Sequence, residues 1–367
     1  MSKRFIHSIN YLRGLCMLGV IAIHIGSVAL TNPTPNLGLI AVLEILSRFS
    51  VPAFFFLSAF GLFYKYPLQG PFSYTTYLKR RLKTVFIPYL FWSLFYLCYM
   101  SVAEHSYTLF RPLTLGKTLL FGLSMYHIYF LVILLWFYLL MPLWRYLLKK
   151  TDRHASIFFP LLFIGNVIFN YYSSYVWIAP PTSLWHDLFV YRLNYLVLHY
   201  IFIFFFGAFT AEHFPAVIAW MKNHAVFLYL FQGAAVLAML GSYAGVMHYW
   251  QYSALSAVFT IHQLSPIGMI YTVSTLLFFL YRWECRSLSP VWQRLFTLLG
   301  NVSYPMYLVH PVWLSIGAAY LHHRHLVPDA AYILCLYLFV TLTSLLYSLL
   351  IQKISLPSWL QICLGIK

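Results

Sequence analysis

Two ionisable residues, Arg13 and His24, lie in an apolar stretch that is long enough to cross a lipid bilayer, residues 9–30. A charged or titratable side chain is costly at membrane depth, so such residues mark candidate functional sites. The two positions are eleven apart, which on an α-helix puts them within about 20° of one face and roughly 16 Å apart along the axis. The structural alternative is a snorkelling arginine and a packed core histidine.

A second apolar stretch, residues 38–64, carries Glu44 and Arg48, whose spacing of four predicts an ion pair on one helix. Glu44 and His24 lie at similar distances from the outer ends of consecutive segments, so antiparallel helices would place them at one depth. Glu44 could then hold the His24 imidazole in one tautomer and raise its basicity. The alternative is a structural Glu44–Arg48 pair that never contacts His24, and the sequence leaves both open.

The third segment opens on a cluster of cations that includes Arg80, Arg81 and Lys83. Such a cluster is typical of an ordinary cytoplasmic anchor of a membrane helix. It could also bind the phosphates of a nucleotide-like cofactor.

A late segment, residues 294–321, has an unusual density of polar residues: Asn301, Ser303, Tyr304, Tyr307 and His310, with two prolines among them. Helix-breaking residues at membrane depth are tolerated where they line a cavity enclosed by protein. This segment is expected to run outward like the first one, so His310 should lie at a depth close to that of His24.

The composition indicates an integral membrane protein. Of 367 residues, 62% are hydrophobic and only 8% are charged, which no soluble domain of this size resembles. We predict an all-α polytopic fold in which residues 1–367 form a single domain with no appended soluble domain. The net charge of +16 is spread between apolar segments, so we expect no nucleic-acid partner.

About ten transmembrane helices are expected, at 8–30, 38–64, 76–103, 126–148, 155–173, 190–212, 218–247, 258–282, 294–321 and 329–352. With a cytoplasmic N-terminus, most Lys and Arg residues fall on the cytoplasmic side, including Lys3, Arg4 and Lys367. The positive-inside rule therefore puts both termini in the cytoplasm. Of the two longest polar gaps, 104–125 has the periodicity of an interfacial or re-entrant helix and 173–189 is typical of an ordered loop at headgroup level.

These patches together resemble the acyltransferase 3 family of integral membrane acyltransferases. The resemblance rests on Arg13-x10-His24, on the Phe49–Ser58 stretch, on the basic start of the third helix, and on Gly300–Tyr304 followed by His310-Pro311. Two positions depart from the family pattern. Lys83 stands where the family usually has Arg, which puts bidentate phosphate contact there in doubt, and Ala59 stands where the second-helix signature usually has Gly.

The resemblance implies a multi-pass protein of the bacterial cytoplasmic membrane that transfers an acyl group from cytoplasmic acyl-CoA. Acetyl is the expected group, with succinyl as an alternative, and the acceptor is a hydroxyl of a cell-surface glycan or of its lipid-linked precursor. Membrane lipid and a separate extracytoplasmic transferase are further candidate partners, and no metal is expected.

The implied site combines two groups of residues. The catalytic candidates are His24, Arg13 and Glu44, and Arg13, Arg80, Arg81 and Lys83 would hold coenzyme A. His24 would act as general base or accept the acyl group itself, and the sequence leaves both routes open. The substrate and oxyanion candidates are Arg48, Asn301, Ser303, Tyr304, Tyr307 and His310.

Two functions of other classes compete with this interpretation. One is a polytopic glycan or lipid transporter whose buried His and Arg handle protons or substrate. The other is a non-catalytic partner in a polysaccharide synthesis complex. Binding of acetyl-CoA separates the enzyme from both, because neither alternative needs the thioester.

Overall fold

The computed structural model describes residues 5–181 and 185–366, and it is helical with no strand in those ranges. The all-α prediction is confirmed. Lys3, Arg4 and Lys367, three of the charges used for the topology, lie outside the described residues. The chain divides into two compact units, residues 1–62 with 206–354, and residues 63–205 with 355–367.

Unit 1 contains the first and the last of the candidate site residues along the chain, Arg13 and His310. Its helices are α1 (His7–Ala29), α2 (Leu37–Ile40), the π-helical turn η1 (Ala41–Ile45), most of α3 (Ser50–Lys65), the end of α12 (Ile201–Glu212), α13 (Phe214–Asn223), α14 (Ala225–Tyr249), α15 (Ala254–Thr260), α16 (Pro266–Cys285), α17 (Pro290–His323) and α18 (Ala330–Lys353).

Unit 2 contains the basic segment and the two long polar gaps. Its helices are α4 (Tyr74–Arg81), η2 (Leu82–Phe86), α5 (Ile87–Ala103), η3 (Thr108–Phe110), α6 (Pro112–Phe121), α7 (Tyr129–Leu139), α8 (Met141–Thr151), η4 (Asp152–His154), α9 (Ala155–Tyr171), η5 (Tyr172–Val176), α10 (His186–Val190), α11 (Arg192–Tyr195), η6 (Val197–Tyr200), the start of α12, and α19 (Ser358–Cys363).

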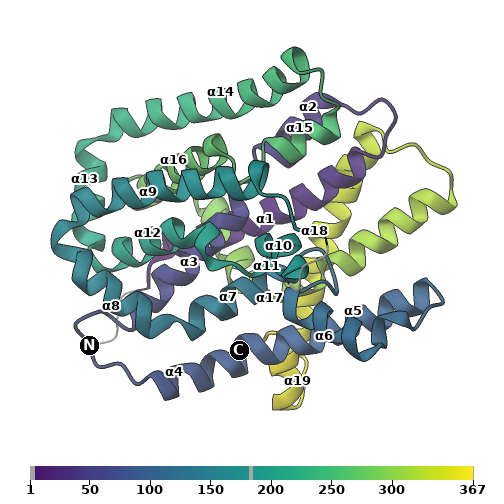
Figure 1. Ribbon diagram of the computed structural model, residues 1–367, viewed down its shortest axis with the longest axis horizontal. Helices are drawn as coiled ribbons and strands as arrows, with labels where there is room; N and C mark the ends of the chain where they lie inside the picture. Colours follow the sequence, from purple (N-terminus) through teal and green to yellow (C-terminus); the bar gives the residue numbers. More distant parts are fainter. Residues whose placement is uncertain (1–4, 182–184, 367) are drawn as a thin grey trace. The chain divides into compact units, whose positions relative to one another are not determined.

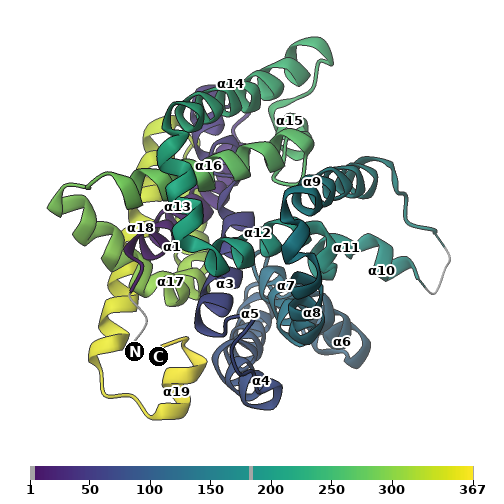
Figure 2. The ribbon, with the colours of Figure 1, turned by 90° about the vertical axis from the view of Figure 1, so that its left-hand side faces the viewer.

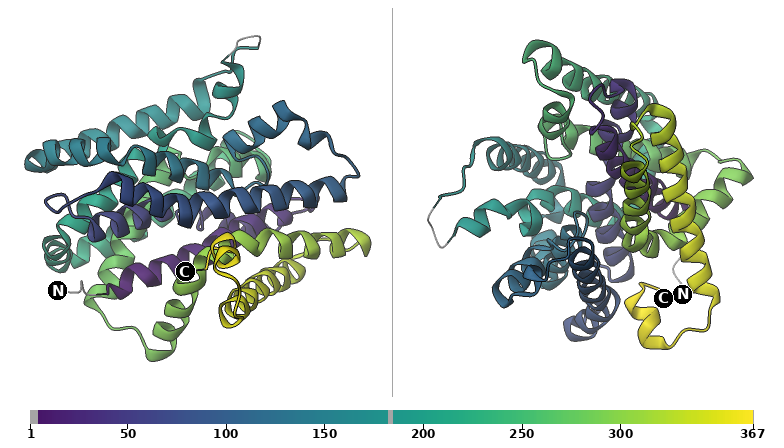
Figure 3. Two further views of the ribbon diagram at one scale, coloured as in Figure 1. Left: turned by 90° about the horizontal axis from the view of Figure 1, so that it is seen from below. Right: turned by 90° about the vertical axis from the view of Figure 1, so that its right-hand side faces the viewer.

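In unit 1, α1 packs against α17 and α18, and α14 packs against α16 (Figures 1 and 2). The yellow-green α17 and yellow α18 are seen beside the purple α1 in Figure 3. Glycines permit the closest approach: a Cβ added at Gly14 of α1 would lie 3.0 Å from the Leu299 Cβ of α17. Small residues at a helix–helix contact are the usual way in which membrane helices approach each other.

Within residues 5–181 and 185–366, six helical stretches are long and apolar enough to cross a membrane, and a bent pair, Val197–Glu212 with Phe214–Asn223, would make a seventh. The six are His7–Ala29, Leu37–Lys65, Tyr74–Ala103, Met141–Val176, Ala225–Tyr249 and Ala330–Lys353. Large apolar side chains are widely exposed, such as Leu230 and Leu237 of α14 at 68% and 73%, as a lipid-facing helix requires. The count of ten spans and the cytoplasmic termini stay predictions.

Several predicted segments are divided differently in the structure. Residues 126–148 do not form one helix, because α7 ends at Leu139 and a new helix, α8, begins at Met141 with Pro142 in its first turn. Residues 258–282 contain a break, because the Ser265 hydroxyl caps the start of α16 by accepting from the Gly268 amide at 3.0 Å. The expected helix in 104–125 is present as α6. Part of the predicted 173–189 loop, residues 182–184, lies outside the described residues.

Candidate active site

Helix α1 carries Arg13 and His24, both half-buried. The Arg13 guanidinium lies beside α3, since a Cβ added at Gly61 would be 3.4 Å from its Nη2. The guanidinium is therefore within van der Waals contact distance of a Cβ at position 61. The helix is continuous from His7 to Ala29, so the predicted separation of roughly 16 Å between the two positions holds.

His24 lies against His310 of α17. The two imidazole rings stack with centroids 5.3 Å apart and an interplanar angle of 20°, so the expected common depth of the two histidines is confirmed. The Nδ1 of His310 donates to the Tyr307 carbonyl oxygen at 2.8 Å. That hydrogen bond fixes the proton of a neutral ring on Nδ1 and leaves the Nε2 lone pair as the basic position.

Glu44 and Arg48 form the predicted ion pair, with 2.7 Å between Glu44 Oε2 and Arg48 Nη2 and only 1% of the Glu44 side chain exposed. The other carboxylate oxygen accepts from the Ser27 hydroxyl at 2.9 Å. Ser27 lies three residues after His24 on α1, so Glu44 is anchored to that helix within one turn of the histidine. The contact is made through a serine that no sequence pattern singles out.

The polar residues of α17 divide between two roles. The Asn301 Oδ1 accepts from the Asn10 amide of α1 at 3.0 Å, and the Ser303 hydroxyl donates to the Gly300 carbonyl oxygen at 3.0 Å. Asn301 therefore connects α17 to α1, whereas the Ser303 bond stays within α17. Tyr307 positions His310 through its carbonyl oxygen. Tyr304, half-buried, lies one turn before Tyr307 and six residues before His310 on the same helix.

The basic residues of the third predicted segment belong to unit 2. Arg80 is exposed and its Nη1 donates to the Tyr66 hydroxyl at 3.2 Å. Arg81 lies over the rings of Tyr77 and Tyr138, with its guanidinium carbon 5.7 and 5.3 Å from the centroids. Lys83 is exposed on η2. The aromatic contacts orient Arg81, whereas the charged groups of Arg80 and Lys83 lie at the surface of unit 2.

Residues outside the predicted set also join the polar region of unit 1. Arg48 Nη1 donates to Gln263 Oε1 at 3.3 Å, and Gln263 lies in the short linker between α15 and α16. The Ser265-Pro266 pair is a helix-start signature that could have placed this linker outside a helix. Non-helical backbone between two apolar segments is a pointer to a functional cavity.

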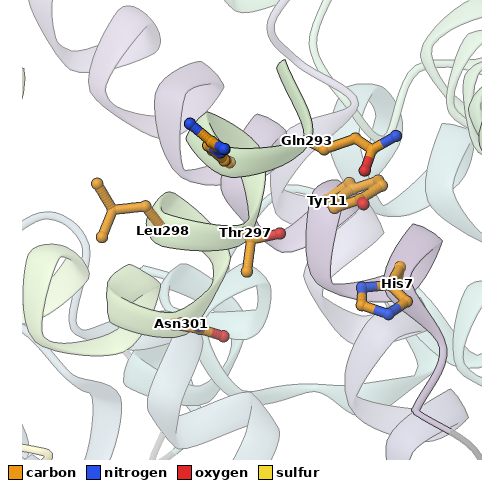
Figure 4. A pocket seen from close by; sticks show the side chains of 7 residues that line it. His7, Tyr11, Gln293, Thr297, Leu298 and Asn301 are labelled. Carbon is orange, nitrogen blue, oxygen red and sulfur yellow. The ribbon is translucent and has the colours of Figure 1, made fainter. Parts of the chain in front are cut away.

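A pocket of about 370 Å³ opens at the N-terminal end of α1. Figure 4 shows His7 and Tyr11 extending from α1, and Gln293, Thr297, Leu298 and Asn301 from α17. Arg294 completes its lining. This pocket is at the end of α1 that carries Arg13, away from His24, and the sequence did not indicate it. Across the described residues, no group of three or more His, Cys, Asp or Glu side chains could hold a metal ion.

Comparison with known proteins adds the decisive observation: residues 6–349 match the family described as "Acyltransferase domain". The chain belongs to the acyltransferase 3 family. It is an acyltransferase and a multi-pass membrane protein.

Two relatives accompany this family assignment. The acyltransferase 3 chain is 24% identical over 361 residues to "Putative membrane-bound acyltransferase YfiQ" of Bacillus subtilis (strain 168), a match that covers 95% of this chain and 92% of that protein. It is also 24% identical over 250 residues to "Probable poly-beta-1,6-N-acetyl-D-glucosamine export protein" of Staphylococcus aureus (strain Mu50), covering 66% of this chain and 64% of that protein. No solved structure matches the chain.

Proposed function

We propose that this acyltransferase moves an acyl group, acetyl in the first instance, from cytoplasmic acyl-CoA to a hydroxyl of a cell-surface glycan or its lipid-linked precursor. The observation that carries the proposal is the stacked pair of His24 and His310, whose rings come from two helices and meet 5.3 Å apart. A histidine with a fixed tautomer beside a second imidazole is equipped to take and return a proton.

Two routes are compatible with this pair. In the direct route, a histidine Nε2 takes the proton of the acceptor hydroxyl, whose oxygen attacks the thioester carbonyl carbon. The carbon–sulfur bond then breaks, and the coenzyme A thiolate receives the proton as a thiol. In the acyl-enzyme route, a His24 nitrogen attacks the thioester carbonyl carbon, the carbon–sulfur bond breaks, and coenzyme A leaves as a thiol with the proton of the other ring nitrogen. The acceptor hydroxyl then attacks the acyl-imidazole, the carbon–nitrogen bond breaks, and the imidazole takes the hydroxyl proton. Tyr304 is the candidate donor to the carbonyl oxygen as negative charge develops.

The donor is proposed to be held from the cytoplasmic side. Under the ten-span topology with cytoplasmic termini, Arg13 lies nearer that side than His24, and Arg80, Arg81 and Lys83 lie at a cytoplasmic helix start. Arginine is well suited to phosphate recognition, because its planar group donates two parallel hydrogen bonds. The roughly 16 Å between Arg13 and His24 is comparable to the reach of an extended pantetheine arm.

A glycan acceptor is supported by the name of the Staphylococcus aureus relative, which refers to a poly-N-acetylglucosamine. The same name favours a second candidate function, export of a polysaccharide through the membrane. The two functions make opposite predictions about the thioester, since an exporter has no use for acyl-CoA.

The test is binding and hydrolysis of radiolabelled acetyl-CoA by the purified protein in lipid nanodiscs. We expect Arg13→Ala to weaken binding, and His24→Ala to abolish turnover while binding survives. The matched controls are Arg153→Ala and His248→Ala, which remove an exposed arginine and an exposed histidine and should change neither quantity. Full activity of His24→Ala would refute both routes, and no binding of acetyl or longer acyl donors by the unmodified protein would favour export.

A further inference from the structure

A group of polar side chains from three separate elements of unit 1 surrounds the Glu44–Arg48 ion pair. We call it the Arg48 cluster: Glu44, Arg48, Tyr243, His262 and Gln263. Glu44 comes from η1, Tyr243 from α14, and His262 and Gln263 from the linker between α15 and α16. Only Glu44 and Arg48 were selected from the sequence.

The contacts in the cluster use only part of the hydrogen-bonding capacity of its polar groups. Arg48 bonds Glu44 at 2.7 Å and Gln263 Oε1 at 3.3 Å. Because the amide oxygen of Gln263 accepts from Arg48, the amide nitrogen is its remaining donor. The side chain of Arg48 is 14% exposed, and Ser27 beside Glu44 is exposed. The cluster is therefore accessible from one side.

Tyr243 is the residue that points to a ligand. It is 2% exposed and belongs to α14, which packs against η1. Its hydroxyl is close enough to Glu44 to interact electrostatically, yet it has no hydrogen-bond partner within the described ranges. A buried hydroxyl without a partner destabilises the folded protein, and such a group in a native structure calls for an explanation.

The frame around the cluster is rigid. The Ser265 hydroxyl donates to the His262 carbonyl oxygen at 2.7 Å and caps α16. The Leu264 amide donates to His262 Nδ1 at 3.1 Å, which leaves Nε2 as the donor of a neutral imidazole. The Tyr271 hydroxyl of α16 donates to the Leu46 carbonyl oxygen at 2.8 Å. Groups held in this way are preorganised to bind.

The charge of the cluster restricts the chemistry of its ligand. Glu44 neutralises Arg48 at 2.7 Å, so the ion pair has no net charge to offer a phosphate or a carboxylate. What remains are directional hydrogen-bonding groups: the guanidinium edge, an amide nitrogen and a phenol. Several such groups at fixed positions suit a neutral polyhydroxyl compound, whose hydroxyls both donate and accept.

The cluster borders the histidine pair. The charge of Arg48 interacts with His24, and Glu44 is bonded to Ser27, one turn from His24 on α1. A hydroxyl held by this cluster would therefore lie next to the imidazole that is to deprotonate it. Holding the acceptor in this way supplies the orientation that a transfer reaction needs.

We propose that Arg48, Gln263 and Tyr243 form the acceptor subsite of the enzyme, which binds the hydroxyls of a neutral sugar beside His24. This inference rests on the proposed acyl transfer. Glu44 is then a positioning residue that orients and neutralises Arg48. The subsite binds the acceptor and leaves the binding of acyl-CoA to other residues.

The experiment measures two reactions of the same purified protein in nanodiscs. The first is hydrolysis of radiolabelled acetyl-CoA by water. The second is acetylation of chitotriose and maltotriose, with trigalacturonic acid as an anionic probe. We expect Gln263→Ala and Tyr243→Phe each to raise the KM for the neutral trisaccharides about tenfold. Hydrolysis of acetyl-CoA by both variants should stay within twofold of the unmodified protein.

Two control variants remove the same chemical groups elsewhere. Gln232→Ala deletes a glutamine that bonds Ser274 at 2.8 Å between α14 and α16, and Tyr337→Phe deletes a hydroxyl that bonds the Leu18 carbonyl oxygen at 3.2 Å. Both should keep the acceptor KM unchanged. If they raise it as much as Gln263→Ala and Tyr243→Phe do, the effect is structural and the subsite is refuted.

The remaining outcomes distinguish failure of the acceptor subsite from failure of the proposed acyl transfer. Unchanged acceptor KM in Gln263→Ala and Tyr243→Phe, preference for trigalacturonic acid, or acetyl-CoA turnover with none of the three probes acetylated would overturn the subsite and leave acyl transfer standing. Failure of the unmodified protein to bind or hydrolyse acetyl-CoA would instead overturn the proposed function.

Discussion

Gly300→Ala should disrupt the contact on which the histidine pair depends. Gly300 of α17 faces Asn10 of α1, and an added Cβ would meet the Asn10 backbone oxygen and lie 2.7 Å from Oδ1 and 2.8 Å from Cγ of its side chain. Ordinary carbon contacts begin at about 3.4 Å, so α1 and α17 must separate by roughly 0.6 Å or more. The same two helices carry His24 and His310.

The size of the effect follows from two opposing terms. Overpacking a tight contact costs about 1–3 kcal/mol, whereas replacing Gly by Ala inside a helix contributes about 0.5–1 kcal/mol in the other direction. We expect a net loss of about 1–2 kcal/mol and a Tm lower by about 2–4 °C. A displacement approaching 1 Å at a reacting group can lower turnover by up to about 100-fold. We therefore expect a larger proportional loss of turnover than of the free energy of unfolding.

The assay pairs thermal unfolding with hydrolysis of acetyl-CoA for Gly300→Ala and for Gly241→Ala. Gly241 of α14 is the matched control, because an added Cβ there meets nothing within 4 Å. Gly241→Ala should keep full activity and an equal or higher Tm. If the two variants behaved alike, the α1–α17 contact would not position the site and the reasoning would be wrong.

Three further outcomes are expected. Arg145→Ala should destabilise the protein by about 3 kcal/mol. The buried Arg145 donates to the carbonyl oxygens of residues 66, 67 and 68 at 2.6, 2.9 and 3.2 Å. The control in the thermal unfolding measurement is Arg111→Ala, which removes an exposed arginine. Glu44→Gln should cost about 2–3 kcal/mol by leaving the Arg48 charge uncompensated, and adding Arg48→Met should restore most of the lost Tm. An alkaline phosphatase fused after residue 367 should be inactive in intact cells if the C-terminus is cytoplasmic, and an active fusion would reverse the topology.

The helices that were predicted well are those with continuous apolar sequence. Residues 8–30 and 329–352 are nearly coincident with α1 and α18, since length and hydropathy decide such segments without tertiary information. The segments that were divided wrongly contain local stop and start signals. Pro142 lies in the first turn of α8, and Ser265 caps α16. The prediction followed the high hydropathy of these segments and did not use either signal.

The site was predictable as far as spacing and depth determine it. Arg13 and His24 share a face because helix geometry requires it, and the matching depth of His310 followed from the direction of its segment. Tyr243 and Gln263 could not be found in this way. Their roles depend on which helices pack together, and an isolated Tyr or Gln in an apolar segment carries no pattern of its own. The Glu44–Arg48 pair could be predicted because the two residues are four apart in one helical stretch, Leu37–Lys65.

The separation of Arg13 from His24 has a consequence for the choice of donor. If Arg13 holds the phosphate end of coenzyme A and His24 meets the thioester, the binding energy at one end of α1 positions the reacting group at the other. A truncated donor, S-acetyl-N-acetylcysteamine, lacks the phosphates and should be hydrolysed far more slowly than acetyl-CoA. Arg13→Ala should lower kcat/KM for acetyl-CoA about 10–100-fold, the value of a charge-assisted contact, and change that of the truncated donor less than twofold. Equal losses for the two donors would place Arg13 at the reacting end, because only a group that acts on the thioester itself affects both.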